Sequence, residues 1–213
     1  MQMARFFESR TVSSILRSRG SLNRGGEYDD TIQKELDRQL QDRGRPVQPS
    51  EVFPTSAGHP KGDLTLVNKA RVLLHVAAVQ SVAADARVIP FKESHQIASS
   101  VRSALDAMAT INAADGVFSP VGTAQRIEQE RLASMGLGHL RSIVFPLLGT
   151  GQGGATAAEV VSPMLDAIID FLGDARNEKF SSELQDIYIA AYTQEDVNVV
   201  TSELGRRLRQ TIG

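Results

Sequence analysis

The sequence predicts an α/β protein in which a mixed, mostly parallel central sheet lies between helices in a three-layer α/β/α arrangement. Short runs of β-branched and aromatic residues alternate with longer segments of helical periodicity. One of these runs ends in a glycine-dense turn that leads directly into a helix. With 213 residues, 41% of them hydrophobic and 23% charged, the chain has a globular composition. We expect a single domain over residues 1–213.

The first part of the chain is predicted to contain two helices. The first lies within residues 1–24, bends near residues 13–14 and ends at Gly20. A polar loop over residues 21–27 follows, and residues 25–213 are expected to form the core. The second helix runs to Gly44 and repeats an apolar residue every four positions. Its apolar residues are Tyr28, Ile32, Leu36 and Leu40.

The rest of the chain alternates between strand and helix patterns. Four runs bounded by Gly, Pro or polar residues predict buried strands, at residues 52–55, 71–79, 142–148 and 186–192. Four segments of helical period are expected at residues 93–112, 124–135, 157–172 and 195–208. Residues 113–120 are predicted to form a loop beside the sheet. This order favours a largely parallel sheet that is covered on both faces.

Composition excludes several classes of site. The chain has no Cys, so disulfides, thiolate nucleophiles and cysteine-bound metals are ruled out. Its four His are scattered without metal-ligand spacing, and neither a metal nor a cofactor is expected. A formal net charge of -2 gives no direct signal for nucleic acid. The sequence has no apolar targeting region and no membrane-length apolar stretch, so we predict a cytoplasmic protein without a membrane partner.

The most informative segment runs from residue 142 to residue 154, with the sequence S-I-V-F-P-L-L-G-T-G-Q-G-G. A strand that ends in such a turn before a helix makes an anion site, because glycines let backbone amides approach phosphate oxygens. The helix dipole would add positive potential. The predicted diphosphate-binding residues are Gly149, Thr150, Gly151, Gln152, Gly153 and Gly154.

Two better-known phosphate loops fit this segment poorly. A Walker A loop ends in Gly-Lys-Ser/Thr, whereas Gly154 is followed by Ala155. A dinucleotide fingerprint needs an acidic residue at the end of the next strand, but that strand arrives some 30 residues later and ends in Tyr192. A nucleotide hydrolase with a Walker A loop and a Rossmann dinucleotide site are therefore both disfavoured.

The segment does resemble the second ligand loop of the macrodomain family, which binds ADP-ribose and its derivatives. Further matches follow in the family's order: residues 55–58 (T-S-A-G), residues 72–76 (V-L-L-H-V) and the last strand, residues 187–192 (I-Y-I-A-A-Y). The resemblance covers roughly residue 25 to the C-terminus. It implies that Tyr192 stacks on adenine; an aromatic residue packed at a sheet edge is the alternative.

Upstream, residues 25–32 (G-G-E-Y-D-D-T-I) resemble the family's first ligand loop. The resemblance implies ligand contacts from Gly25 and Gly26, and it places Asp29 where members that remove ADP-ribose carry an acidic residue. A carboxylate there could orient water or act as a base. The alternative is an acidic residue at the start of a helix. Glu27 and Asp30 depart from the family's glycine-like positions.

Family members have two strands before this loop, and this sequence begins after them. We expect that the natural chain starts further upstream, since a central strand is hard to omit without exposing backbone groups. A rival alignment places residues 62–65 (G-D-L-T) at the family's opening motif, with Asp63 near adenine. Its weakness is that the following strand, which contains His75, lacks the expected Asn.

Three functions follow from the resemblance. The first is binding of ADP-ribose or a related nucleotide of NAD metabolism, free or attached to an ADP-ribosylated protein partner. The second is hydrolysis of ADP-ribosylated or cyclic ADP-ribose-type substrates, with Asp29 as the catalytic residue. The third is a macrodomain-like scaffold with a degenerate site.

Overall fold

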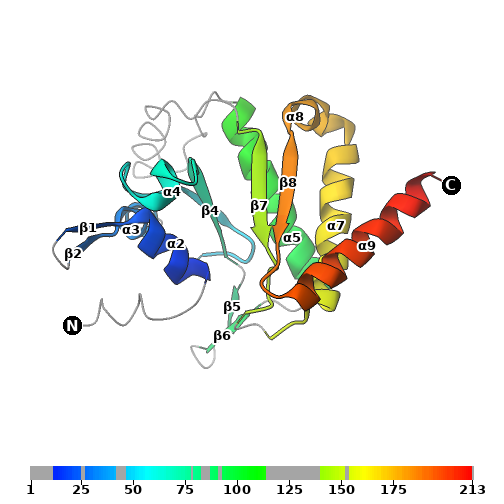
Figure 1. Cartoon of the computed structure of the whole chain (residues 1–213), viewed down its shortest axis with the longest axis horizontal. Helices are drawn as coiled ribbons and strands as arrows, with labels where there is room; N and C mark the ends of the chain where they lie inside the picture. Colours follow the sequence, from blue (N-terminus) through cyan, green and yellow to red (C-terminus); the bar gives the residue numbers. More distant parts are fainter. Residues whose placement is uncertain are drawn as a thin grey trace. The chain divides into compact units, whose positions relative to one another are not determined.

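The computed structural model describes residues 12–24, 27–41, 47–77, 79–82, 87–90, 93–113, 140–151 and 154–212. The chain forms two compact units (Figure 1). The first unit holds α2 (Val12–Gly20), β1 (Leu22–Arg24), β2 (Glu27–Asp29), α3 (Thr31–Gln41), α4 (Asp63–Leu66) and most of β3 (Val52–Ser56) and β4 (Val72–Val76). The second unit holds β5 (Val79–Val82), β6 (Arg87–Pro90), α5 (Ser94–Ala113), β7 (Ser142–Pro146), α7 (Ala157–Gly173), η1 (Ala175–Asn177), α8 (Glu178–Glu183), β8 (Asp186–Ala190) and α9 (Gln194–Ile212).

A hairpin and a helix replace the loop and longer helix that were predicted near the start of the first unit. β1 and β2 pair antiparallel, with Asn23 opposite Tyr28. The predicted loop over residues 21–27 is therefore wrong, because it contains β1 and the start of β2. The predicted helix is present but begins at Thr31 and not at Tyr28. Asp30 explains where α3 begins: its carboxylate accepts the amide of Gln33 at 3.1 Å, as a helix N-cap does.

β3 and β4 form a two-stranded antiparallel sheet. At one end the Ala57 amide donates to the Arg71 carbonyl at 3.2 Å, and at the other the Ala77 amide donates to the Glu51 carbonyl at 2.9 Å. Strands were predicted at residues 52–55 and 71–79, and both are present. The second one ends at Val76, and its residues are only partly buried and not buried as predicted.

The core of the first unit is small and depends on close backbone contacts. Ile32, Ala57 and Leu64 are buried together. Gly58 has a φ of 96°, and a Cβ built on it would lie 2.2 Å from the Gly20 carbonyl oxygen. Glycine is therefore required at residue 58 both by conformation and by packing.

In the second unit, β7 and β8 pair in parallel, with Val144 opposite Tyr188. Side chains alternate across these strands: Phe145 is 4% exposed, whereas Val144 is 60% exposed. In the described residues this pair is a two-stranded sheet whose carboxyl ends lie at the same edge. The loops that follow the two strands therefore emerge side by side.

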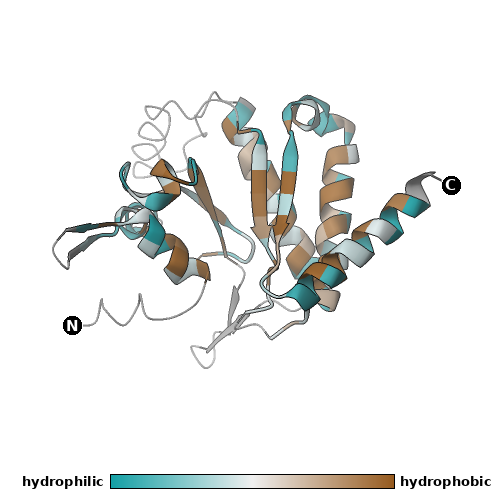
Figure 2. Cartoon of the chain, viewed as in Figure 1, coloured by the Kyte–Doolittle hydropathy of each residue, from teal (hydrophilic) through white to brown (hydrophobic). Residues whose placement is uncertain are grey.

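Helix α7 supplies much of the apolar surface of the second unit (Figure 2). Its buried side chains recur at helical spacing and are Val160, Val161, Met164, Leu165, Ile168 and Phe171, with Ala157 and Ala167 between them. α7 packs against α9, and Arg207 of α9 forms an ion pair with Asp166 of α7.

Asn112 connects the end of α5 to the start of β7 through two hydrogen bonds with the backbone of Leu140, at 2.8 and 2.9 Å.

The predicted α/β class is confirmed by this mixture of helices with parallel and antiparallel strands. The helices predicted at residues 93–112, 157–172 and 195–208 are present as α5, α7 and α9. The predicted helix at residues 124–135, most of the predicted loop at residues 113–120 and residues 1–11 of the predicted first helix lie outside the described residues. Within the described part of the chain, none of the helices has the length and apolar character needed to cross a membrane.

Candidate functional site

The glycine-rich loop lies between β7 and α7, at the carboxyl end of the parallel strand pair. Buried Phe145 and Leu147 anchor it on one side, and buried Ala155 anchors it on the other. Gly149 and Gly154 have φ angles of 88° and 69°, which side-chain-bearing residues rarely adopt. The predicted site residues Gln152 and Gly153 lie outside the described residues.

Hydrogen bonds within the loop hold its shape. The Gly154 amide donates to the Gly151 carbonyl, and the Ala155 amide donates to the Gly149 carbonyl, both at 3.1 Å. The Thr150 amide and hydroxyl both donate to the Leu147 carbonyl, at 3.4 and 2.8 Å. The amides of Thr150 and Gly154 are therefore used by the turn itself, and the role of these two residues in binding a diphosphate stays a prediction.

The amides of Gly149 and Gly151 differ from those two. Among the residues that the structure describes, nothing accepts a hydrogen bond from either amide. Gly151 is exposed, and a Cβ built on it would have no neighbouring atom within 4 Å. Its φ lies outside the left-handed region as well. Neither packing nor backbone conformation explains why residue 151 lacks a side chain, whereas both explain it at Gly58.

A capping box closes the N-terminus of α7 two residues after the loop. Thr156 donates its amide and its hydroxyl to Glu159 Oε2, at 2.7 and 2.9 Å, and its hydroxyl oxygen accepts the Glu159 amide at 3.3 Å. Glu159 was not among the predicted site residues, although the spacing T-x-x-E is a known signature of such a cap. The positive potential expected from the helix N-terminus is therefore partly offset by a negative side chain.

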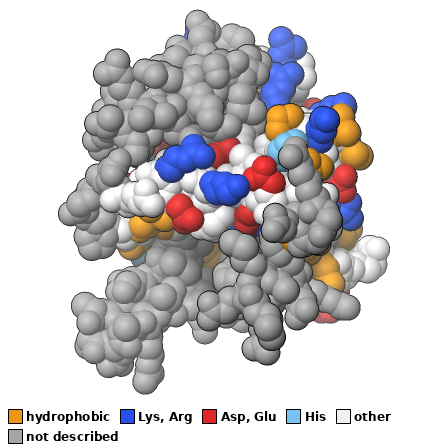
Figure 3. Space-filling model, turned by 90° about the vertical axis from the view of Figure 1, so that its left-hand side faces the viewer, with side chains coloured by type: hydrophobic (Ala, Val, Ile, Leu, Met, Phe, Trp, Pro, Cys, Tyr) orange, Lys and Arg blue, Asp and Glu red, His pale blue; other side chains and the backbone are white. Residues whose placement is uncertain are grey.

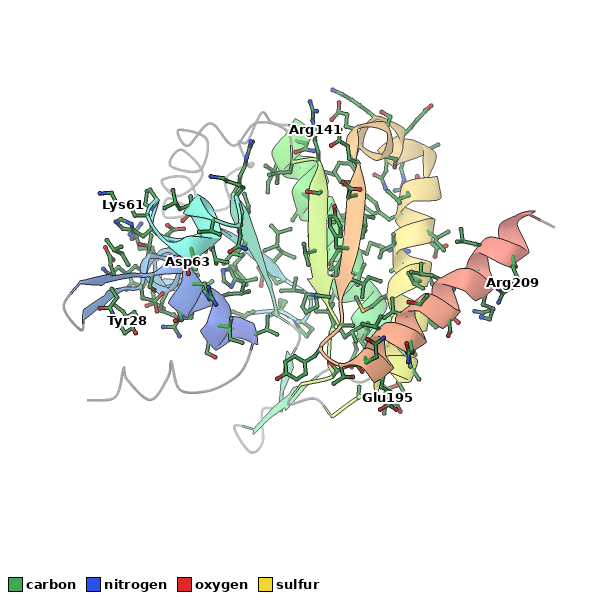
Figure 4. The ribbon with its side chains drawn as sticks, viewed as in Figure 1. Tyr28, Lys61, Asp63, Arg141, Glu195 and Arg209 are labelled. Carbon is green, nitrogen blue, oxygen red and sulfur yellow. The ribbon has the colours of Figure 1, made fainter. Side chains whose placement is uncertain are left out.

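Tyr192 lies two residues beyond the end of β8 and is 91% exposed. A second capping box follows it: Thr193 donates its amide and hydroxyl to the Asp196 carboxylate at 3.1 and 2.9 Å. Figure 4 shows that Arg141 and Glu195 mark opposite ends of the β7–β8 pair, with Glu195 at the carboxyl ends. The loops after both strands thus carry amides and an aromatic ring, and the first turns of the helices that follow carry carboxylates.

The residues predicted for the first ligand loop belong to the first unit. Gly25 and Gly26 lie outside the described residues, between β1 and β2. Asp29 ends β2, and its carboxylate accepts the Lys34 ammonium at 2.8 Å. Helix capping, the structural alternative considered for Asp29, is performed by Asp30 instead. The catalytic role of Asp29 stays a prediction.

Basic and acidic side chains alternate on the surface of this unit (Figure 3). Asp63, the residue that the rival alignment would place near adenine, is exposed and accepts Arg19 Nη1 at 2.9 Å. Asp30 forms a less exposed pair with Arg17, whose Nε donates at 2.8 Å. Pairing of this kind leaves no broad cationic patch among the described residues of this face.

The contacts of His75 are those of a packing residue. Its Nε2 lies 2.9 Å from the Thr55 hydroxyl, which itself donates to the Ser56 carbonyl at 3.0 Å. Burial, with a smaller contribution from the charge of Arg17, lowers the pKa of His75 to about 4. The ring is therefore neutral at physiological pH and forms part of the packing around β3.

The comparison with solved structures identifies the fold. A point variant of the macrodomain from Oceanobacillus iheyensis aligns with 95% of this chain and 76% of its own, at 15% identity and a TM-score of 0.55. A second point variant of that macrodomain, with ADPR, and the macrodomain with ADP each align with 84% of this chain, and with 69% and 68% of their own, at 16% identity and a TM-score of 0.49. No family model and no curated protein matches the sequence. The chain has the macrodomain fold.

Proposed function

We propose that this chain binds ADP-ribose or a related NAD-derived nucleotide, with the diphosphate held by the glycine-rich loop at residues 149–154. The proposal depends on one observation, the accessible backbone and missing side chain of Gly151. Its amide has no acceptor among the described residues, its surroundings are open, and neither packing nor φ requires a glycine there. A phosphate that approaches the backbone closely gives a reason for the missing side chain.

The position of the loop supports the same function. Ligands of open α/β sheets bind outside the carboxyl ends of parallel strands, and the loop lies at the carboxyl end of β7. Tyr192 follows the neighbouring strand, β8, and exposes its ring. An aromatic face at that edge is suited to stack on a nucleotide base. ADP-ribose is the first nucleotide to test, because ADPR is named with the Oceanobacillus iheyensis macrodomain.

Isothermal titration calorimetry with ADP-ribose tests the proposal on the wild-type chain and on Gly151→Glu. A carboxylate at residue 151 would both fill the space for the phosphate and repel it, so we expect affinity to fall by at least about tenfold. Gly173→Glu is the matched control, since Gly173 is also exposed, has open space around it and lies at the far end of α7.

The expected result is binding by the wild-type chain and by Gly173→Glu, and weak or no binding by Gly151→Glu. If the wild-type chain gives no heat with millimolar ADP-ribose, the nucleotide function is wrong. If Gly151→Glu binds as well as Gly173→Glu, the nucleotide lies elsewhere and the loop assignment is wrong.

A further inference from the structure

The segments around the carboxyl ends of β7 and β8 contain no bases, and acids lie in the first turns of the helices that follow the two strands. Residues 142–175 and 180–205 include no Lys, Arg or His. The same segments place Glu159 at the start of α7 and Glu195 and Asp196 at the start of α9. Diphosphate sites commonly use charge-assisted bonds from Arg or Lys. A diphosphate at these strand ends would therefore be held by neutral donors such as backbone amides, and not by cationic side chains of these two segments.

Glu159 is the acid closest in sequence to the glycine-rich loop, and its position is fixed. Two donors of Thr156 hold its Oε2 at 2.7 and 2.9 Å, and Thr156 follows Gly154 by two residues. The carboxylate therefore stays at the amino end of α7, where the helix would otherwise present positive potential to a phosphate.

We infer that Glu159 limits the negative charge that the glycine-rich loop accepts, so that the loop prefers an internal diphosphate diester to a nucleotide ending in a free phosphate. The inference rests on the proposed function. At neutral pH a terminal phosphate carries about one negative charge more than a phosphate within a diester. Repulsion by a fixed carboxylate grows with the charge of the ligand, and therefore penalises the terminal phosphate more.

Glu159→Gln tests this inference, because glutamine retains an oxygen that can accept both Thr156 donors and also serves in capping boxes. ADP-ribose and ADP would be titrated into the wild-type chain and into the variant. We expect the variant to bind ADP-ribose about two- to fivefold more tightly. The gain for ADP should be larger, so that the preference for ADP-ribose becomes smaller.

Glu178→Gln is the matched control. It removes the same charge from an exposed residue of α8, which begins after the far end of α7, roughly 25 Å along the helix axis. At physiological ionic strength a charge at that distance is screened. We therefore expect neither affinity to change in this variant.

The outcomes separate the inference from the proposed function. If the wild-type chain binds ADP-ribose but Glu159→Gln leaves both affinities unchanged, lowers them, or raises them by equal factors, the inference is overturned. The inference is also overturned if Glu178→Gln gives the same gains. Absence of binding for both nucleotides in every variant overturns the proposed function and the inference with it. Thermal melting of the variants establishes that the Glu159→Gln chain remains folded.

Discussion

At the scale of single residues, Tyr192 is the side chain whose exposure most needs a reason. Aromatic rings stabilise a fold by burial, yet this ring is 91% exposed beyond the end of β8. Stacking on a base typically contributes enough that removal of the ring lowers affinity roughly tenfold. We therefore expect Tyr192→Ala to weaken ADP-ribose binding by that factor and Tyr192→Phe to retain it, as measured by calorimetry.

Tyr188 provides the control for Tyr192. It is also an exposed tyrosine, but it lies in the middle of β8, where it faces Val144 across the strand pair. Tyr188→Ala should leave affinity unchanged. Equal losses in Tyr188→Ala and Tyr192→Ala would mean that the effect comes from the strand and not from contact with the base.

His75 links pH to the stability of the first unit. Burial lowers its pKa from 6.5 to about 4. Above pH 6.5 the ring is neutral in both the folded and unfolded chains, and its contribution to stability is complete. Between pH 6.5 and 4 the unfolded chain binds a proton that the folded chain does not, so stability falls as pH falls. The total loss should be about 3 kcal/mol, of which about 2 kcal/mol falls above pH 5.

Urea unfolding at intervals from pH 7.5 to 5 measures this contribution. In His75→Gln the amide can still donate to the Thr55 hydroxyl but cannot titrate. The variant should therefore lose less stability than the wild-type chain over this range. Parallel curves for the two proteins would show that the pH dependence arises from other groups.

The buried carboxylate of Glu35, also in the first unit, could not be predicted from the sequence. Glu35 is completely buried, and its carboxylate accepts the amide and hydroxyl of Ser56 at 2.7 and 2.6 Å. Helical periodicity places Glu35 within α3 but does not disclose a buried partner on β3. A contact between residues so far apart in sequence depends on the packing of two elements, which a local pattern does not contain.

At the scale of secondary structure, long and strongly patterned segments were predictable and short ones were not. β7, β8, α5, α7 and α9 follow from runs of β-branched residues or from helical periodicity. The β1–β2 hairpin was missed because its strands have three residues each, and because Tyr28 also fits the helical repeat of α3. Four-residue α4 was too short to show periodicity.

For the glycine-rich loop, the position was predictable from the sequence but the hydrogen bonding of its amides was not. Its place between a strand and a helix followed from the order of residue types. Which amides remain available could not be predicted, because this depends on the φ angles of Gly149 and Gly154 and on the hydrogen bonds of Thr150. The Glu159 cap was recoverable from the spacing of Thr156 and Glu159.

Alternation along β7 gives a test at the scale of the element. Phe145 points into the second unit, whereas its neighbour Val144 is mostly exposed. Phe145→Ala should lower the free energy of unfolding by about 3 to 5 kcal/mol, since it leaves a cavity. Val144→Thr should change it by less than about 0.5 kcal/mol. Denaturant unfolding of both variants measures these effects, and similar losses would contradict the register of β7.

At the scale of the whole molecule, charge is arranged in local pairs. Arg19 pairs with Asp63, Lys34 with Asp29, and Arg206 with Glu203, at 2.6 to 2.9 Å. The net charge is -2. A chain of this kind has no long-range field that would attract an anionic ligand. Nucleotide affinity at the proposed site would then come from short-range contacts at the strand ends.

This arrangement predicts an unusual response of nucleotide binding to salt. A site built from Lys and Arg loses affinity for an anion as ionic strength rises, because salt screens the attraction. The loops after β7 and β8 instead supply neutral amides, and acids such as Glu159 lie in the first turns of the helices that follow. Raising salt from about 0.05 to 0.5 M should therefore leave ADP-ribose affinity unchanged or increase it by up to about threefold, because it screens a repulsion. Calorimetry at several salt concentrations measures the slope, and a marked loss of affinity would show that cations hold the diphosphate.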